Sequence, residues 1–383
     1  ITKQVIESGV DFILGGGELH MLPVGTNGFH ETAAQLDARS TNSIDRPSEN
    51  LIELAKQRGY TVVYTRDQLF DLLDPAKTPV LPTKVLGVFA AFHTFNDRSE
   101  EVLKLGQPDA TPLYVPTAPT TAEMLEVTQK LAEKHPNFNN GSITILEEEG
   151  TDNFGNINNA AGTLEAVRRA DAAIGKALEF IDRNPNTLLI TAADSDGGGL
   201  QVREVSRTST TVGTINANPT TEARTVPLDG QTGSNTAPFV SAPDANGDTS
   251  TFGVGWVGTP DFAGSIVTKA HGLNSEKLPA TADNTVIYEL MYETLFNTEL
   301  SSRVEAPKAA PAATRDTGNV IFIHPDGTSP SHFAATRFVD KGADGRLNWD
   351  QMSNAGVYLG HMEDQLTGTS NAGAVTHATG VKV

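Results

Sequence analysis

The feature that most constrains this chain is a run of strand, long helix and strand in its middle. SITILEEE (142–149) predicts a strand, residues 159–183 have the apolar spacing of a long amphipathic helix, and TLLITAAD (187–194) predicts a second strand. A strand, a crossover helix and a further strand usually form a βαβ unit with parallel strands. The sequence therefore predicts an α/β fold around a mainly parallel central sheet.

The same alternation extends along most of the 383 residues, and an open α/β sheet of this length can be one domain. We expect 1–304 to form the main part of a single α/β domain and 318–383 to complete it. Residues 205–252 are rich in Thr, Asn, Gly and Pro with little periodicity, which indicates a long surface excursion. Residues 305–317 are rich in Pro and Ala, which is typical of a linker or an N-terminal tail.

Composition excludes several kinds of function. The formal net charge of −19 argues against a basic surface for nucleic acid or for anionic membranes. The absence of cysteine excludes disulfides, thiolate metal sites and a cysteine nucleophile. No run of eighteen apolar residues occurs, so we expect no membrane span.

Three apolar segments end in an aspartate: NVIFIHPD at Asp326, SITILEEEGTD at Asp152 and TLLITAAD at Asp194. Each alone is more often a turn or cap residue. Ligands of open parallel sheets bind beyond the carboxyl ends of the strands, where these side chains can meet. With Glu147, expected on the same strand as Asp152, they predict a multi-metal site for hard divalent ions, which suits phosphoryl displacement.

Ser370 stands at the start of a predicted Ala-rich helix. Free N–H groups and the positive end of the helix dipole at such a position favour an anion and a serine alkoxide. Ser370 is therefore a candidate nucleophile for attack on phosphorus. Taken alone it is more simply an ordinary helix cap.

The string TGTSNAGAVTHATGVK resembles the nucleophile helix of the alkaline phosphatases, and Thr379, Gly380, Val381 and Lys382 stand at the family spacing. NVIFIHPDG, EEEGTDNFGNINNAAGT, LLITAAD and DNTVIYELMY also have counterparts there, so the resemblance covers most of the chain outside 205–252. It implies an alkaline-phosphatase-like three-layer sandwich. It also implies a metal-dependent phosphomonoester hydrolase that acts through a phosphoserine at Ser370 and assembles as a homodimer.

By the same resemblance, Glu147 and Asp326 would hold a magnesium-type ion, Asp152 one catalytic ion, and Asp326 with Asp194 the other. Members of the family usually carry three histidine ligands, and those positions read Asn156, Ser195 and Asn235 here. Imidazole favours zinc, whereas oxygen ligands favour magnesium, calcium or manganese. We therefore expect two or three divalent ions, with magnesium, calcium or manganese favoured and zinc, the family default, as the alternative. Asp196 could supply a further oxygen.

The order of the segments also departs from the family. The part with Asp326 and Ser370 comes first in the family but last here, and the segment with the phosphate-gripping arginine is missing. Arg337 is better explained as a solvated helix residue. Three arrangements fit: a circular permutant, two fragments of a nicked protein in reversed order, or a longer chain whose disordered segment is left out of this sequence. We favour the last two. The segment from Glu305 resembles the start of a mature secreted protein, so we expect a periplasmic or extracellular location.

Other functions remain open at this point. A phosphodiesterase of the same superfamily would share the metal core, since that core does not select the leaving group. A sulfatase is disfavoured because its Cys or Ser with nearby Pro and Arg is missing. A catalytically silent relative that binds phosphate or metal would explain the replaced histidines. Small phosphate monoesters are the expected substrates.

Overall fold

A computed structural model describes residues 1–39, 46–204, 214–215, 224–225, 228–229, 238–264, 266–298, 300 and 317–383. The chain forms two compact units. Residues 1–96 and 112–138 make up the first, and residues 97–111 and 139–383 the second. The expected boundaries at 304 and 318 lie inside the second unit. The expected single domain stays a prediction.

The first unit is built on a parallel sheet of three strands in the order β1-β3-β2, with β1 at Phe12–Gly15, β2 at Thr61–Val63 and β3 at Val85–Val88. Apolar side chains of the sheet and of the surrounding helices form two buried clusters. Gly59 ends the helix before β2 at a φ of 86°, a conformation that favours glycine. The helices are α1 (Thr2–Ser8), α2 (Ala33–Arg39), α3 (Leu51–Gln57), α4 (Arg66–Asp71) and α6 (Thr121–Ala132).

The second unit contains a sheet of six strands in the order β15-β17-β14-β5-β16-β4. The strand β16 pairs in parallel with both β5 and β4, and β15 pairs in parallel with β17. Only β14 runs antiparallel to its two neighbours within this sheet. The bounds are β4 (Ile143–Glu147), β5 (Thr187–Thr191), β14 (Ile266–Gly272), β15 (Thr281–Asp283), β16 (Asn319–His324) and β17 (Asn354–Leu359).

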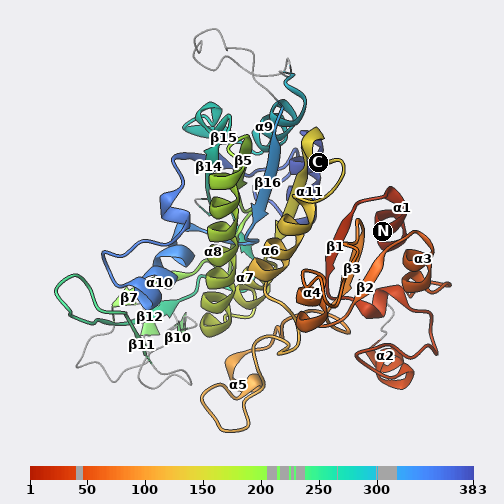
Figure 1. Ribbon diagram of the computed structural model, residues 1–383. Helices are drawn as coiled ribbons and strands as arrows, with labels where there is room; N and C mark the ends of the chain where they lie inside the picture. Colours follow the sequence, from red (N-terminus) through yellow and green to blue (C-terminus); the bar gives the residue numbers. More distant parts are fainter. Residues whose placement is uncertain are drawn as a thin grey trace. The chain divides into compact units, whose positions relative to one another are not determined.

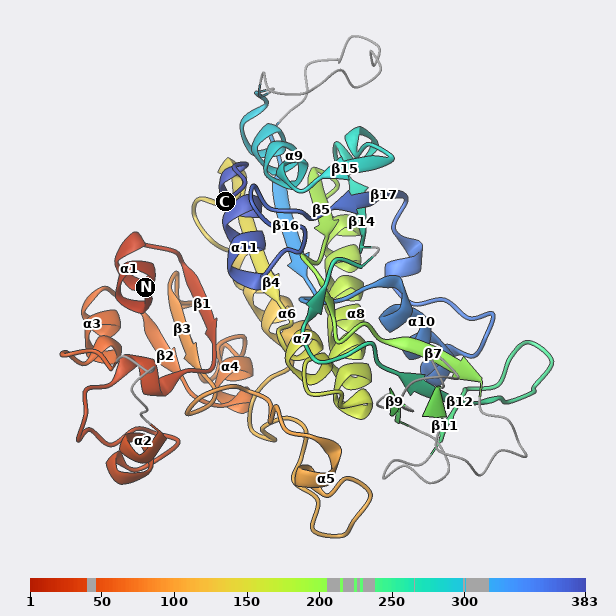
Figure 2. The same ribbon diagram turned by 180° about the vertical axis from the view of Figure 1, so that it is seen from behind.

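Helices cover both faces of this sheet. The helix α8 (Ala160–Arg183) packs against β5 and β16 on the face seen in Figure 1, with α10 (Pro330–Lys341) beside it. The opposite face carries α9 (Thr285–Phe296) and α11 (Ser370–Thr379), which contact each other and lie toward the viewer in Figure 2. The predicted α/β class with a mainly parallel sheet is confirmed, and the second unit has three layers. The parallel strands of the chain, however, are divided between two sheets.

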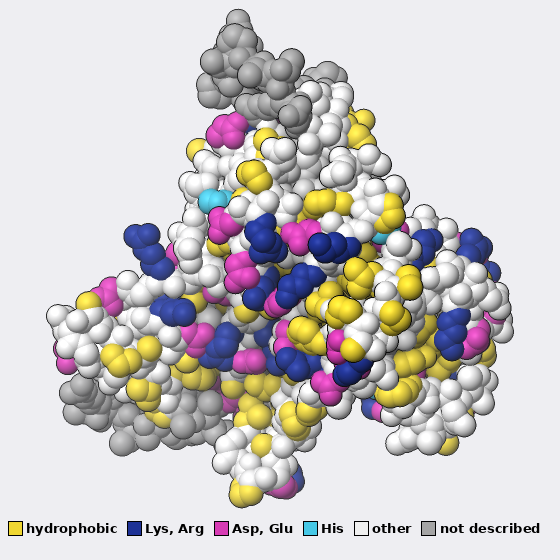
Figure 3. Space-filling view, viewed as in Figure 1, with side chains coloured by type: hydrophobic (Ala, Val, Ile, Leu, Met, Phe, Trp, Pro, Cys, Tyr) yellow, Lys and Arg dark blue, Asp and Glu magenta, His cyan; other side chains and the backbone are white. Residues whose placement is uncertain are grey.

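The helix α8 is the βαβ crossover that the sequence predicts. Asn159 caps its start, and its apolar side is buried in the unit. Its outer side carries ion pairs such as Arg168 with Asp340 and Arg169 with Glu165. Lys, Arg, Asp and Glu side chains are accordingly mixed across the middle of the face shown in Figure 3, as expected for a solvated helix surface.

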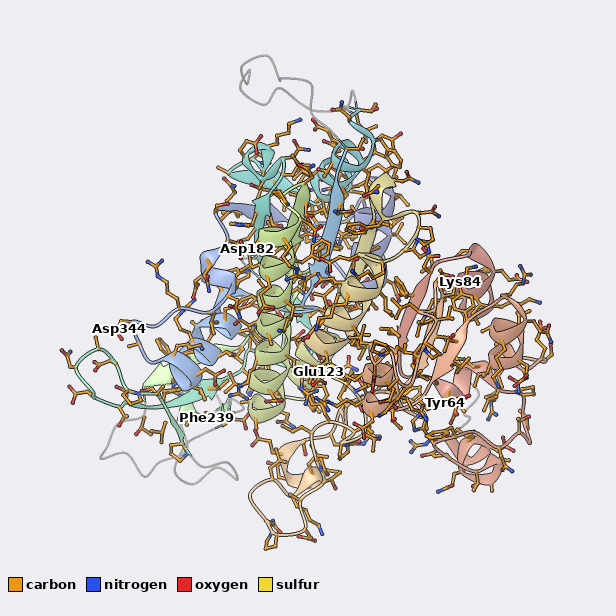
Figure 4. The ribbon with its side chains drawn as sticks, viewed as in Figure 1. Tyr64, Lys84, Glu123, Asp182, Phe239 and Asp344 are labelled. Atoms are coloured by element: carbon orange, nitrogen blue, oxygen red, sulfur yellow. The ribbon has the colours of Figure 1, made fainter. Side chains whose placement is uncertain are left out.

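A smaller antiparallel sheet shares a buried apolar cluster with α8 and α10. Its central strand is β12 (Thr251–Gly255), which pairs with β7 (Gln201–Glu204), β10 (Leu228–Asp229) and β11 (Phe239–Val240). Phe239, labelled in Figure 4, stacks on Phe252 with 5.6 Å between the ring centroids. The described parts of the expected excursion at 205–252 thus include paired strands.

The remaining elements are short. They are α5 (Glu100–Leu103), α7 (Gly150–Gly155), β6 (Asp196–Gly197), β8 (Thr214–Ile215), β9 (Arg224–Thr225), β13 (Asp261–Phe262) and the 3-10 turns Glu18–Met21, Phe138–Asn140, Ser275–Lys277 and Trp349–Gln351. Residues 305–316 of the expected linker lie outside the described residues. In the parts of the chain that the structure describes, every helix is too short or too polar to cross a lipid bilayer.

Candidate metal centre and active site

The candidate site lies at the carboxyl ends of β4, β16 and β5. These three strands are neighbours and parallel, so their ends reach the same edge of the sheet. Glu147 is the last residue of β4, Asp326 follows β16 by two residues, and Asp194 follows β5 by three. The structure therefore brings together the three carboxylates that the strand-end argument predicted to meet.

Asp152 reaches the same place from a helix. The expectation that it shares a strand with Glu147 is wrong, because β4 ends at Glu147 and Asp152 lies in the first turn of α7. Two glycines make room for it. A Cβ on Gly327, whose φ is 61°, would stand 2.6 Å from Asp152 Oδ1, and one on Gly197 would stand 2.8 Å from the same oxygen.

Asp326 is the centre of the cluster. It is fully buried and belongs to two groups of three possible metal ligands, each group with its donor atoms within 4.8 Å of one another. The first group is Glu147, His324 and Asp326, and the second is Glu149, Asp152 and Asp326. The first group contains one nitrogen donor and the second offers oxygen alone. The interpretation of Asp326 as a bridging ligand fits this geometry.

Two members of these groups were missed by sequence reasoning. Glu149 is the third glutamate of EEE, and the sequence does not show which of the three side chains faces inward. His324 is the last residue of the mostly apolar strand β16, so it does not stand out as a site residue in the sequence. The available signal is that it ends this strand only two residues before Asp326. The site therefore contains an imidazole, although the three positions where the family carries histidine do not.

The carboxyl groups of the cluster change one another's pKa values. Burial, followed by the charge of Asp326, raises the pKa of both Asp152 and Glu149 to about 9. Burial and Asp326 also hold the pKa of Asp194 well above its ordinary value. Burial would raise the pKa of Asp326 as well, but Asp194, His324 and Ser370 outweigh it and hold that pKa well below its usual range. Near neutral pH and without a cation, Asp326 is ionised, whereas Asp152, Glu149 and Asp194 keep their protons.

Ser370 lies against Asp326, a member of the cluster. It is the first residue of α11, it is half-buried, and its hydroxyl faces Asp326 closely enough to lower the pKa of that carboxyl. The side chain of the preceding residue, Thr369, forms no capping hydrogen bond in this structure. Asp194 packs on the same helix, since a Cβ on Gly373 would stand 2.5 Å from the Asp194 Cβ.

The other predicted ligands take different places. Asn156 lies beside Asp152 but turns its amide group toward it, with Nδ2 donating to Asp152 Oδ2 over 2.6 Å and to Asp261 Oδ1 over 3.2 Å. Asp261, which sequence reasoning missed, thereby joins the edge of the site. Ser195 is buried, and its hydroxyl has no hydrogen-bond partner among the described residues. Asn235 lies outside the described residues.

Asp196 and Arg337 have contacts of their own. Asp196 Oδ1 lies 3.7 Å from Nδ1 of His332, a fully buried histidine whose Nδ1 is 3.0 Å from Ser329 Oγ. Arg337 donates two hydrogen bonds, of 2.8 and 2.6 Å, to the carboxylate of Asp350. Arg337 is thus held in a bidentate pair.

The residues present fit a divalent cation. Several polar atoms of the cluster are buried without a hydrogen-bond partner in the described part of the chain: Asp152 Oδ1, both carboxylate oxygens of Asp194, Asp326 Oδ2 and His324 Nε2. Buried polar atoms are normally paired, and carboxyl groups so close together can ionise together only when a cation offsets their charge. A bound cation would satisfy both requirements.

Comparison with known proteins agrees with this chemistry. A family model described as alkaline phosphatase matches residues 1–293. Alkaline phosphatase H of Pseudomonas aeruginosa (strain UCBPP-PA14) is 28% identical over 201 residues, which are 51% of this chain and 38% of that protein. The chain thus spans well under half the length of this relative.

Solved structures give weaker similarities. The alkaline phosphatase of Thermus thermophilus shares 25% identity at a TM-score of 0.36, over 51% of this chain and 33% of that one. The alkaline phosphatase of the Antarctic bacterium TAB5 shares 17% identity at a TM-score of 0.39, over 72% of this chain and 57% of that one. Since the family model covers residues 1–293 of 383, the chain belongs to the alkaline phosphatase family.

Proposed function

We propose that this protein hydrolyses phosphate monoesters through a covalent phosphoserine at Ser370. The observation that carries the proposal is the position of the Ser370 hydroxyl, at the first residue of α11 and facing the ionised Asp326. A serine hydroxyl becomes a useful nucleophile only when a neighbouring group helps to remove its proton or to stabilise its alkoxide. Ser370 has such a neighbour.

In this reaction Ser370 Oγ forms a bond to phosphorus while the bond from phosphorus to the ester oxygen breaks, and the alcohol leaves with a proton. Water then attacks the phosphoserine, which releases inorganic phosphate and restores the hydroxyl. Asp326 orients the hydroxyl and accepts its hydrogen bond. Asp194, packed against Gly373, fixes the start of α11 next to the cluster.

The start of α11 suits the anionic substrate. The N–H of Gly373 bonds to the carbonyl of Thr369, whereas the N–H groups of the three residues before it precede the first intrahelical hydrogen bond. Thr369 does not cap them with its side chain. Together with the positive end of the helix dipole, these donors can bind phosphate oxygens.

The cofactors we propose are two or three divalent ions. Glu149, Asp152 and Asp326 would hold one in an all-oxygen pocket that suits magnesium, calcium or manganese. Glu147, Asp194 and Asp326 would contribute to a second pocket. Such ions offset the negative charge of the phosphoryl group and lower the pKa of a bound hydroxyl or water. The acidic chain needs this local reversal of charge, because its net charge is −19.

The test is turnover of a chromogenic phosphate monoester, with the matching diester measured in parallel. We expect hydrolysis of the monoester, loss of activity with a chelator and recovery when divalent ions are added back. Preference for the diester would favour a phosphodiesterase of the same superfamily. No turnover with any ion would favour a silent relative that binds phosphate or metal.

A homodimer and a periplasmic or extracellular location are also proposed, on the family resemblance alone. Sedimentation of the full chain would test the first, and fractionation of the cells that make it would test the second. A monomer or a cytoplasmic protein would contradict them without affecting the assignment of Ser370.

A further inference from the structure

The geometry points to His324 Nε2 as a metal ligand, in a pocket that it forms with Asp326 and Glu147 and that accepts a borderline ion such as Zn²⁺ or Co²⁺. The inference rests on the proposed metal-dependent function and adds a ligand that the expected oxygen set lacks. It also assigns different ion preferences to the two pockets that meet at Asp326.

A hydrogen bond to the backbone fixes the orientation of the His324 ring. His324 Nδ1 lies 2.7 Å from the backbone carbonyl of Ala192, so Nδ1 donates its proton there and Nε2 faces the carboxylates. Burial lowers the pKa of His324, but Asp326, Asp194 and Glu147 raise it to about 10, so an ion that binds Nε2 displaces a proton from it. A backbone carbonyl on the far nitrogen is the usual support of a metal-binding histidine.

The position of Nε2 fits a shared ion better than a direct ion pair. Nε2 lies 3.3 Å from Asp326 Oδ1 and 3.8 Å from Asp194 Oδ1, and neither contact is aligned as a hydrogen bond. A charged N–H donor normally approaches a carboxylate oxygen to about 2.8 Å. Two donor atoms of one tetrahedral zinc ion, each about 2.0 to 2.1 Å from the metal, stand about 3.3 Å apart. The observed spacing is that of two ligands.

A buried polar nitrogen without a hydrogen-bond partner destabilises the fold, so His324 Nε2 is expected to bind a ligand. His324 is 5% exposed, and its Nε2 has no hydrogen-bond partner among the described residues. A neighbouring imidazole has a hydrogen-bond partner of its own. His377 lies 5.5 Å from His324 between ring centroids, and its Nε2 is 2.7 Å from the Tyr358 hydroxyl.

The consequence is a difference in ion preference between the two pockets. Imidazole nitrogen favours zinc, cobalt and similar ions, whereas a set of oxygens alone favours magnesium, calcium or manganese. His324 would therefore restore a nitrogen ligand to a site whose usual histidine positions carry other residues. The expectation of hard ions then applies to the pocket of Glu149 and Asp152, and not to that of His324.

X-ray absorption at the zinc edge tests this directly on the full chain, after metal removal and addition of Zn²⁺. The wild-type spectrum should contain imidazole scattering. In His324→Asn, whose shorter amide can still donate to Ala192 but cannot reach the ion, this scattering should vanish and the affinity for Zn²⁺ should fall at least about 100-fold. The control is His332→Asn, an equally buried histidine of the same unit, which should keep both.

Three outcomes would overturn the inference: no imidazole scattering in the wild type, scattering that persists in His324→Asn, or unchanged Zn²⁺ affinity in that variant. If His324→Asn does not fold, ¹⁵N spectra of wild-type histidines decide, since Zn²⁺ should shift the Nε2 resonance of a ring whose Nδ1 stays protonated. None of these readouts uses a substrate. A zinc-bound His324 in a protein without phosphatase activity would reject the proposed function alone.

Discussion

The starts of α8 and α11 face the same physical problem and meet it differently. At α8, three N–H groups bond to side chains: Ala160 to Asp229 over 3.2 Å, Ala161 to Glu100 over 2.9 Å, and Gly162 to Asn159 over 2.8 Å. At α11, Thr369 provides no side-chain cap, and Ser370 faces Asp326. The first three N–H groups of α8 thus bond to side chains of the protein, whereas those of α11 receive no such cap from Thr369.

The difference separates a structural helix start from a candidate binding site. The N-terminal N–H groups of α8 are satisfied in the folded protein, so their hydrogen bonds contribute to stability and leave no room for a ligand. Those of α11 lack a cap from Thr369, and the proposed function assigns them to an anionic substrate. Changes at α11 should therefore affect activity, and changes at α8 should affect the free energy of unfolding.

The largest effect is expected for Ser370→Ala. Loss of the proposed attacking oxygen should lower kcat at least about 1,000-fold, as for other nucleophile deletions. Acid quenching with a labelled phosphate monoester should then show no covalent phosphoprotein, while the circular dichroism spectrum stays unchanged. The matched control is Ser331→Ala, which removes a serine hydroxyl from the first turn of α10. A phosphorylated Ser370→Ala protein would show that another residue is the nucleophile.

A pH effect on stability is expected at α8. Burial, followed by the charge of Asp229, raises the pKa of Glu100 to about 7 from an ordinary 4.5. Between these values the unfolded chain loses the proton while the folded protein keeps it, so stability should fall as pH rises from about 4.5 to about 7. The full change is about 3 kcal/mol.

Urea unfolding at several pH values, followed by the fluorescence of Trp256 and Trp349, measures this effect, because both tryptophans lie in the second unit. In Glu100→Gln the amide oxygen can still accept from Ala161, but the side chain at position 100 no longer titrates. The difference in unfolding free energy between variant and wild type should therefore grow with pH. A constant difference across this range would contradict the assignment.

Gly373→Ala tests whether the contact with Asp194 positions the start of α11. The added methyl would meet the Asp194 Cβ at 2.5 Å and displace either the carboxylate or the start of the helix. Misplacement of a catalytic group by about 1 Å can cost roughly 100-fold in rate. Alanine favours helix more than glycine does, so the helix itself should not be weakened. Steady-state kinetics should show a lower kcat, and unchanged kinetics would mean that Asp194 does not position α11.

The smallest effects, on the free energy of unfolding, are expected for two substitutions at the cap positions of α8 and α11. Asn159→Ala removes a cap that bonds to Gly162 and should cost about 1 kcal/mol of unfolding free energy. Thr369→Ala removes a side chain that caps nothing and should change stability by less than about 0.5 kcal/mol. Equal losses from the two variants in urea unfolding would remove the distinction between the two helix starts.

Much of this arrangement could be predicted from the sequence because its signals are local. The helical spacing of 159–183 and the apolar runs before Asp194 and Asp326 correspond to α8, β5 and β16. The carboxylates could be predicted to meet because parallel strands end at a common edge. Ser370 could be placed at a helix start from the Ala-rich run that follows it.

The parts that could not be predicted depend on contacts between distant residues. The caps of α8 at Glu100 and Asp229 lie 61 and 69 residues from the N–H groups that they bind. No residue pattern sets the direction of β14, which is antiparallel to β5. His324 is one polar residue in an apolar run, and only the position of Ala192 shows which way its ring faces.

The sharing of Asp326 between two groups of donors has a thermodynamic consequence. One carboxylate that served both proposed pockets would make their occupancies interdependent, so that the apparent affinity of either ion would depend on whether the other is bound. This dependence is reciprocal: a factor by which magnesium changes zinc affinity is the factor by which zinc changes magnesium affinity. Loading of the centre should therefore be cooperative or antagonistic, and a titration with one ion also measures the state of its neighbour.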